Sequence, residues 1–247
     1  MISTSTSDLR LLLLQVRNDA DPMREHEIGC FERCFRLDRN QIEIFDLLSG
    51  APDAERLDAA DVVLLGGSGD YSVARGGDWL PAALDAMVGL YESSKPTFAS
   101  CWGFQAMARA MGGEVITDRA RAEVGVTWVE LTPAGREDPV FGPLGLRFQA
   151  LSAHEDHVIT LPDEAVLLAS SEGVENQVFH FPGRPIYCTQ FHPELDRAGF
   201  IERMRRYPSY IPLAGASSLE DLEERTPETE HTEGILQRFL ELAMASV

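Results

Sequence analysis

Basic residues are scarce in this chain of 247 residues, which carries 21 lysines and arginines against 40 aspartates and glutamates. The formal net charge is therefore −19 at pH 7. A surface with that charge repels phosphate backbones and anionic lipid headgroups. The composition argues against a nucleic-acid-binding protein and against docking on a membrane surface.

Long hydrophobic runs are missing as well. The longest aliphatic run is Leu11 to Leu14, whereas a helix needs about 20 apolar residues to cross a bilayer. The first ten residues contain one basic residue, Arg10, and lack the charged, apolar and small-residue order of a signal peptide. We therefore expect a cytoplasmic protein without a membrane-spanning segment.

Cysteine is rare, and the four present, Cys30, Cys34, Cys101 and Cys188, do not form a disulfide framework in so long a chain. We expect free thiols. His26, Cys30 and Cys34 recur every four residues and in principle share a helix face that could bind a metal. Steps of four drift around a helix and no fourth ligand is evident, so we expect a core-facing stripe, no metal site and no cofactor.

Short buried strands alternate with helical patterns in the first half of the chain. Apolar or alternating runs predict strands at residues 11–16, 41–46, 62–65 and 96–100, and helical spacing recurs at 79–93 and 103–111. Such alternation favours an α/β fold with a parallel sheet covered on both faces.

The second half changes character. Strand-like runs at 127–131, 165–170, 176–181 and 185–190 are separated by turn residues. They predict an antiparallel extension of the same sheet. A last amphipathic helix is expected at 235–245.

Between these elements, the arginine cluster from Arg203 to Arg206 precedes an acidic stretch from Glu220 to Glu233. The arginines are able to grip a carboxylate or phosphate, but an exposed helix face is the default expectation, as is a solvated surface for the acidic stretch. We expect one domain over residues 1–247, with an insertion at 17–40 and a C-terminal helical segment at 198–247.

Cys101 lies where a predicted strand runs into a predicted helix, in the window Ala-Ser-Cys-Trp-Gly of residues 99–103. A sharp strand-to-helix turn needs small neighbours and pushes its side chain out above the sheet. The free N–H groups and dipole at a helix start also favour a thiolate. The window indicates a nucleophile, with a buried structural cysteine as the alternative.

A base for this thiol is predicted after the strand-like run at 185–190. His192 is able to take a proton from Cys101, and Glu194, two residues on, is able to fix the imidazole tautomer and stabilise imidazolium. Taken alone, the segment is also compatible with a loop that holds a satisfied histidine. The pairing of two strand-end windows favours catalysis.

Two further windows complete the pattern: residues 66–70 read Gly-Gly-Ser-Gly-Asp, and residues 152–158 read Ser-Ala-His-Glu-Asp-His-Val. With Ala-Ser-Cys-Trp-Gly-Phe-Gln at 99–105 and Phe-His-Pro-Glu at 191–194, the chain resembles the class I glutamine amidotransferases, the Cys-His-Glu glutaminase domains. It is similar to the amidotransferase part of GMP synthase. The windows follow the family's order, and together they are specific.

The resemblance covers residues 8–197 and has departures. Ala99 replaces the glycine of the family's Gly-x-Cys-x-Gly-x-Gln elbow, and Ser68 replaces the proline of its Gly-Gly-Pro loop. The window at 152–158 has one residue more than the family's Ser-His-x-Asp-x-Val. Residues 17–40 form a longer connection than the family needs, and 198–233 have no counterpart.

The resemblance implies a flavodoxin-like parallel central sheet flanked by helices, with an antiparallel extension. It implies a catalytic triad of Cys101, His192 and Glu194 that hydrolyses the side-chain amide of glutamine through a thioester. The backbone N–H groups of Gly67 and Trp102 would form the oxyanion hole, and the Trp102 side chain is expected only to pack.

The resemblance also implies that Gln105, Asp156 and His154 contact the substrate, with Asp156 meeting its α-ammonium group. Alternatives remain open for these three. Gln105 is also able to cap or pack within its helix, and His154 with Asp156 is able to form a hydrogen bond that stabilises a loop. For His157 the expected role is structural.

The identity of the ammonia acceptor is open. The sequence lacks a Gly-x-x-x-x-Gly-Lys-Ser/Thr loop and an ATP-pyrophosphatase motif of the Ser-Gly-Gly-x-Asp-Ser type. The chain is then either a glutaminase serving a separate synthetase subunit or a stand-alone hydrolase of γ-glutamyl peptides. A non-catalytic regulatory relative is a third alternative, against which the intact triad residues speak.

Overall fold

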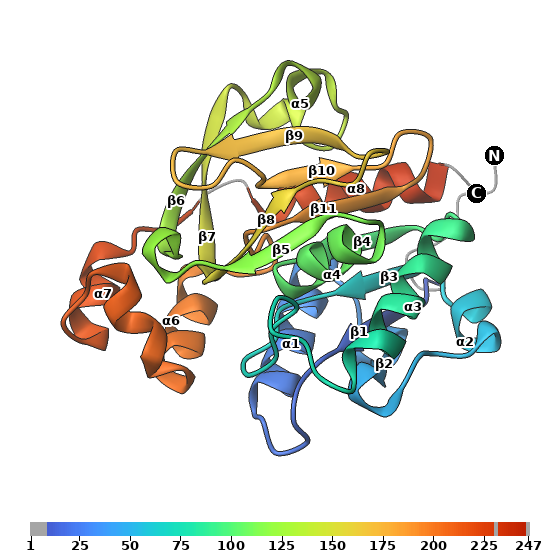
Figure 1. The fold of residues 1–247 in the computed structure, drawn as a ribbon, viewed down its shortest axis with the longest axis horizontal. Coiled ribbons are helices and arrows are strands. Elements are labelled where there is room, and N and C mark those ends of the chain that lie inside the picture. Colours follow the sequence, from blue (N-terminus) through green and yellow to red (C-terminus); the bar gives the residue numbers. More distant parts are fainter. Residues whose placement is uncertain (1–8, 230–231, 246–247) are drawn as a thin grey trace.

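The computed structural model describes residues 9–229 and 232–245. A sheet of nine strands runs through the molecule in the order β2-β1-β3-β4-β11-β10-β9-β6-β7, and β5 pairs with β8 apart from it (Figure 1). The strands are β1 (Leu11–Gln15), β2 (Ile42–Asp46), β3 (Val62–Leu65), β4 (Thr97–Ser100), β5 (Glu114–Thr117), β6 (Glu123–Leu131), β7 (Arg147–His154), β8 (Asp156–Thr160), β9 (Val166–Ser171), β10 (Val178–His180) and β11 (Ile186–Thr189).

The helices pack around this sheet, and short 3-10 turns connect several of them. The helices are α1 (Met23–Phe35), α2 (Ala54–Ala59), α3 (Leu80–Glu92), α4 (Trp102–Ala110), α5 (Pro133–Glu137), α6 (Arg197–Arg206), α7 (Leu219–Arg225) and α8 (Glu233–Ala245), with the 3-10 helix η6 at Pro208–Ala214. None of the helices in the described part of the chain is both long and apolar enough to cross a membrane.

Strands β2, β1, β3, β4 and β11 are all parallel, and each lies within two residues of a predicted strand. The predicted direction of β11 is wrong: the run at 185–190 was assigned to the antiparallel extension, but it pairs parallel with β4 and antiparallel only with β10. Its four residues are all buried, as in the other central strands. The side chains of β1 alternate between two cores: Leu11 and Leu13 face the layer of α1 and α8, whereas Leu12 and Leu14 face the layer of α3 and α4. Continuous apolar strands are typical of sheets buried on both faces. The predicted fold class is confirmed.

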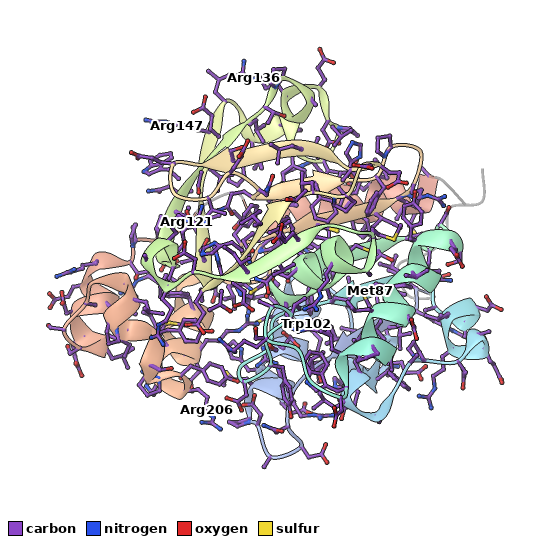
Figure 2. The ribbon with its side chains drawn as sticks, in the orientation of Figure 1. Met87, Trp102, Arg121, Arg136, Arg147 and Arg206 are labelled. Carbon is purple, nitrogen blue, oxygen red and sulfur yellow. The ribbon has the colours of Figure 1, made fainter. Side chains whose placement is uncertain are left out.

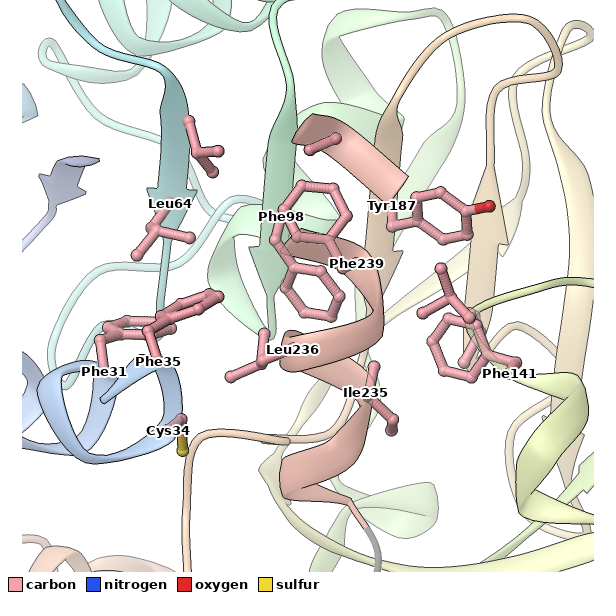
Figure 3. Packing of buried hydrophobic residues seen from close by; sticks show 14 of the residues in the cluster. Phe31, Cys34, Phe35, Leu64, Phe98, Phe141, Tyr187, Ile235, Leu236 and Phe239 are labelled. Carbon is pink, nitrogen blue, oxygen red and sulfur yellow. The ribbon is translucent and has the colours of Figure 1, made fainter. Parts of the chain in front are cut away.

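Helix α8 closes one face of the sheet (Figure 3). Phe239 packs edge-on against Phe98 of β4 at 5.2 Å between ring centroids and against Tyr187 of β11 at 6.0 Å. Phe31 and Phe35 of α1 stack beside them, with centroids 6.3 Å apart. The segment 17–40, expected as an inserted connection, therefore contributes a helix to the main core.

The other strands of the large sheet, β10, β9, β6 and β7, are antiparallel, as the turn-rich second half predicted. Three strands were not predicted: β5, β7 and β8. Val115 and Ile116 of β5 are half-buried, so its four residues carry a weak apolar pattern. Strand β7 ends and β8 begins within the window 152–158, whose histidines and acidic residues interrupt the apolar pattern. The acidic stretch begins with α7, and α6 and α7 form the lower left of the view in Figure 1.

Candidate active site

Cys101 occupies the turn between β4 and α4. Its backbone has φ of 51° and ψ of −100°, a strained conformation for a residue with a side chain. Its N–H donates to the Thr189 carbonyl of β11 at 2.8 Å, which fixes the turn to the neighbouring strand. A Cβ on Gly103 would lie 2.5 Å from Cβ of Leu65. The glycine is therefore required for α4 to leave the sheet so sharply.

His192 follows the adjacent strand. Thr189 of β11 lies opposite Ser100 of β4, so the two strands end side by side, and His192 is anchored by its N–H to the Leu151 carbonyl at 2.9 Å. Its Nδ1 lies 2.7 Å from Oε1 of Glu194. Because a carboxylate only accepts, Nδ1 carries the proton and Nε2 is left as the basic nitrogen.

The sulfur and the imidazole line two adjoining small cavities. Cys101 lines a cavity of about 30 Å³, and His192 lines one of about 20 Å³. Ser68, Ala153 and Tyr210 contribute to both. The sulfur lies 3.9 Å from the Ala153 carbonyl oxygen, and within the described residues no hydrogen bond joins it to His192.

Burial governs the protonation of these groups. It raises the pKa of Cys101 to about 12, an effect that the Glu194 carboxylate reinforces and Arg203 opposes. Burial also holds the pKa of His192 below its usual 6.5, although Glu194 acts the other way. The pKa of Glu194 falls to about 2 because the attraction of His192 and Arg203 outweighs its burial. The pair at rest is a neutral thiol and a neutral imidazole beside an ionised carboxylate.

The two predicted oxyanion donors differ in their surroundings. Trp102 is the first residue of α4, where a backbone N–H has no partner inside the helix, and its side chain lies near the middle of the molecule (Figure 2). The N–H of Gly67 donates to Oε1 of Glu27 at 3.1 Å. A Cβ on Gly67 would lie 2.9 Å from Cε1 of His192. The loop therefore reaches the imidazole, while a buried carboxylate holds its N–H.

The three predicted substrate contacts all line the cavity beside Cys101. Gln105 Nε2 donates to the Asp156 carbonyl at 3.1 Å, and the Asp156 carboxylate accepts 2.6 Å hydrogen bonds from Ser72 and Thr117. His154 lies 3.1 Å from the Asp156 carbonyl oxygen. The predicted loop-stabilising hydrogen bond is therefore present, through the backbone of Asp156. The structure brings the three residues together without assigning them to substrate.

The site is surrounded by buried charged residues, which the sequence motifs did not indicate. Glu27 of α1 is fully buried and accepts from Arg17 at 3.2 Å. Arg203 of α6 lies 3.3 Å from Oε1 of Glu194 and 3.8 Å from Oε1 of Glu27. The expectation of an exposed arginine cluster is wrong for Arg203, which is 3% exposed. It shares a face of α6 with buried Phe200, whereas Arg206 lies at the outer end of the helix (Figure 2).

The cysteine stripe of α1 faces the core as predicted. Cys30 Sγ lies 3.8 Å from Nδ1 of His26, whereas Cys34 Sγ is turned to the Glu194 carbonyl oxygen at 3.5 Å. Residues 9–229 and 232–245 contain no group of three or more histidine, cysteine or acidic side chains placed to hold a metal ion. Cys188 is also buried, on β11.

A cavity of about 640 Å³ lies away from these residues, along β6, α5 and β9. Trp128, Arg136 and Arg147 are among its lining residues, and Figure 2 shows the two arginines at the upper edge of the molecule. It contains none of the predicted site residues. Its size alone does not indicate a function.

Two neighbouring parallel strands end in the site: β4 runs into the turn of Cys101, and β11 runs into the His-Pro-Glu segment. This arrangement defines an α/β protein with a cysteine at a strand-to-helix turn. The family model for "Glutamine amidotransferase class-I" matches residues 28–200. The chain belongs to this family.

Among curated relatives, a glutamine-hydrolyzing GMP synthase subunit of Methanothermobacter thermautotrophicus is 37% identical over 100 residues, which are 40% of this chain and 52% of that protein. The chain thus spans about half the length of this relative. The corresponding GMP synthase subunit of Thermoplasma acidophilum is 32% identical over 60% of this chain and 70% of its own. Gamma-glutamyl peptidase 3 of Arabidopsis thaliana is 27% identical over 71% of this chain and 72% of its own.

Solved structures agree on the fold. A glutamine amidotransferase from Thermotoga maritima superposes with a TM-score of 0.72 at 21% identity, covering 96% of this chain and 98% of that one. A second, from Methylobacillus flagellatus, has a TM-score of 0.67 at 16% identity, covering 95% and 94%. At such identities the likeness extends to the architecture alone.

Proposed function

We propose that the chain is a glutaminase, which hydrolyses the side-chain amide of glutamine to glutamate and ammonia through a thioester on Cys101. The supporting observation is the adjacency of two strand ends: the N–H of Cys101 bonds the last residue of β11, and three residues later His192 bonds Glu194 at 2.7 Å. Nucleophile, base and orienting carboxylate in this arrangement are the requirement for acyl transfer.

The first half of the reaction forms the thioester. Because thiol and imidazole are both neutral at rest, His192 Nε2 takes the thiol proton as the Cys101 sulfur bonds to the amide carbon of glutamine. The carbonyl electrons move to oxygen, the carbon–nitrogen bond then breaks, and His192 returns the proton to the departing ammonia. Glu194 stabilises the transient imidazolium.

The tetrahedral oxyanion needs two donors, each worth about 3 kcal/mol of the barrier. The Trp102 N–H is one. The Gly67 N–H serves as the second once the oxyanion replaces the Glu27 carboxylate, which accepts its hydrogen bond at 3.1 Å. In the second half, water gives a proton to His192 and attacks the thioester, which releases glutamate and the free thiol.

The glutamyl part of the substrate occupies the cavity lined by Gln105 and Asp156, where the carboxylate of Asp156 pairs with the α-ammonium group. The cavity of about 30 Å³ has room for one or two water molecules but not for a glutamine side chain. Binding therefore requires its walls to move. Among the lining residues, Ser68 is half-buried and Arg75 is exposed, and these two are the candidates to move.

The acceptor of the ammonia is proposed to be a separate synthetase subunit, which the names of the GMP synthase relatives support. Hydrolysis of γ-glutamyl compounds is the second candidate, supported by the likeness to gamma-glutamyl peptidase 3. The same three side chains serve either substrate, since the scissile bond is a side-chain amide in both.

Glutamate release from glutamine and from γ-glutamyl dipeptides separates the two candidates. Turnover of glutamine, enhanced by proteins isolated with the chain from its native source, supports the glutaminase. Turnover of the dipeptides alone supports the peptidase. Failure with both substrates, with and without those proteins, together with no reaction of Cys101 with a glutamine-mimicking electrophile, would establish a non-catalytic relative.

A further inference from the structure

Arg203 touches both side chains that are proposed to activate Cys101. Its Nη1 lies 3.3 Å from Oε1 of Glu194 and 3.1 Å from Nδ1 of His192. Its Nη2 lies 3.8 Å from Oε1 of Glu27. The guanidinium is therefore held between the carboxylate of the site and a second buried carboxylate on α1, out of contact with bulk solvent.

Glu194 needs such a partner. It is fully buried, and its Oε2 has no hydrogen-bond partner within the described residues. One hydrogen bond from a neutral imidazole is small compensation for a buried charge, whereas a guanidinium at 3.3 Å supplies an opposite charge. A side chain of α1 braces the backbone of the same residue, because the Arg33 guanidinium donates to the Glu194 carbonyl at 3.1 Å.

The proton on His192 is constrained by the same contact. Arginine only donates, so its approach to Nδ1 makes no hydrogen bond there once Nδ1 carries its own proton for Glu194. A positive charge at 3.1 Å opposes a second proton on the ring. The charge of Arg203 therefore favours a neutral ring, and the ionised Glu194 at 2.7 Å fixes the proton of that ring on Nδ1, which leaves Nε2 free.

We propose, resting on the proposed glutaminase function, that Arg203 is a positioning residue of the hydrolysis. Anchored by Glu27, it keeps Glu194 ionised and His192 neutral with its proton on Nδ1, so that Nε2 remains able to take the thiol proton. It contacts neither substrate nor sulfur in this role. The segment that carries it, α6, lies mostly beyond the stretch that resembles the family.

Several charged and titratable groups face His192 from the packed elements. Glu194 follows it on the same segment, Arg203 comes from α6 and Glu27 from α1. Arg17 after β1, Tyr207 between α6 and η6, and Tyr210 of η6 line the same small cavity, and Cys101 lines the adjoining one. The carboxylates of Glu194 and Glu27 raise the pKa of His192, and the charge of Arg203 lowers it. Removing Arg203 therefore raises the pKa of His192.

The sign of the expected pH effect follows. Neutral His192 is the active form, so kcat/KM falls as the pH drops through the His192 pKa, which lies below 6.5 in the wild type. Replacement by an uncharged side chain moves this acid limb to higher pH. A residue that only anchors α6 would lower activity without moving the limb.

The test compares Arg203→Met, Arg203→Lys and the matched control Arg205→Met. Arg205 lies on the same helix, is 56% exposed and pairs with the neighbouring Glu202. Arg203→Met is expected to lower kcat about 30-fold with KM nearly unchanged and to raise the acid limb by about one pH unit. Arg203→Lys keeps the positive charge but lacks the planar guanidinium with its several donors. The acid limb of its pH profile therefore stays at the wild-type pH, and its kcat is about 5-fold below that of the wild type. Arg205→Met behaves as wild type.

Two readouts are recorded from about pH 5 to about pH 9: kcat/KM for glutamine, and the rate at which a glutamine-mimicking chloroketone alkylates Cys101, located by peptide mass spectrometry. A folded Arg203→Met with the wild-type acid limb in both readouts overturns the proposal. If that variant does not fold, wild-type kcat in Arg203→Lys overturns it. A wild-type protein that neither hydrolyses glutamine nor is alkylated contradicts the glutaminase itself, which is a separate result.

Discussion

The parallel strands and the segment from α6 to η6 contribute to the same site in different ways. Gly67, Cys101 and His192 directly follow or closely follow the ends of β3, β4 and β11, which pair through their backbones. The C-terminal segment instead supplies Arg203 and Tyr210, whose positions depend on side-chain packing against α1 and β6. The reacting groups thus lie on rigid elements, and the groups that tune them lie on helices packed around those elements.

This contrast predicts that substitutions in the two regions affect the protein differently. A change at a strand end removes a reacting atom, whereas a change in the surrounding helices alters the burial or charge of that atom. Variants in the two regions should therefore differ in kind. Loss of activity in a fully folded protein is expected for the first region, and altered stability, pH dependence or selectivity for the second.

The largest effect is expected at the nucleophile. Cys101→Ala removes the sulfur that bonds to substrate, so kcat for glutamine should fall at least about 1,000-fold while the melting temperature hardly changes. Cys188→Ala, at a buried thiol on the neighbouring strand, is the control and should cost about 1 kcal/mol of stability with kcat retained. Comparable activity losses in both variants would remove the distinction.

A large stability effect is expected at Glu27. Glu27→Gln takes one carboxylate partner from each of the buried guanidinium groups of Arg17 and Arg203, and losing one partner of a buried ion pair costs about 3 kcal/mol or more. Denaturant unfolding measures this loss. Glu25→Gln, at an exposed position of the same helix, should change the unfolding free energy by less than about 0.5 kcal/mol. Equal values for the two variants would contradict the supporting role of α1.

The smallest effect concerns selectivity. Tyr210 lines both the cavity beside Cys101 and the cavity beside His192, so Tyr210→Ala widens the space available to a substituent on the leaving nitrogen. The ratio of kcat/KM for γ-glutamylmethylamide to that for glutamine should rise about 5-fold. Tyr210→Phe keeps the ring and should leave the ratio unchanged. A rise in both variants would mean that the ring is not the barrier.

The sequence predicted the parallel half well because its signals are local. Leu11 to Leu14 is a continuous apolar run, and the glycines and small residues around Cys101 mark a turn that only such residues allow. The windows at 66–70, 99–105, 152–158 and 191–194 coincide with residues that the fold brings to one edge of the sheet.

The parts of the site that were not predicted depend on contacts between segments distant in the sequence. Residue type does not distinguish Arg203 from Arg205 and Arg206, because the burial of Arg203 depends on contacts with Glu27 of α1 and with Glu194. Glu27 was not predicted for the same reason; it lies next to His26, outside the stripe of His26, Cys30 and Cys34. A charged residue spaced with Phe200 and Met204 on one face of α6 was the available signal.

The proposed glutaminase mechanism requires that Cys101 is the nucleophile and that glutamine reaches it. Incubation with a glutamine-mimicking chloroketone, followed by peptide mass spectrometry, tests this most directly. The account predicts a single adduct on Cys101, slowed by added glutamine and absent in His192→Ala at neutral pH. Modification of Cys30, Cys34 or Cys188 in its place, or labelling of Cys101 that glutamine does not slow, would contradict it.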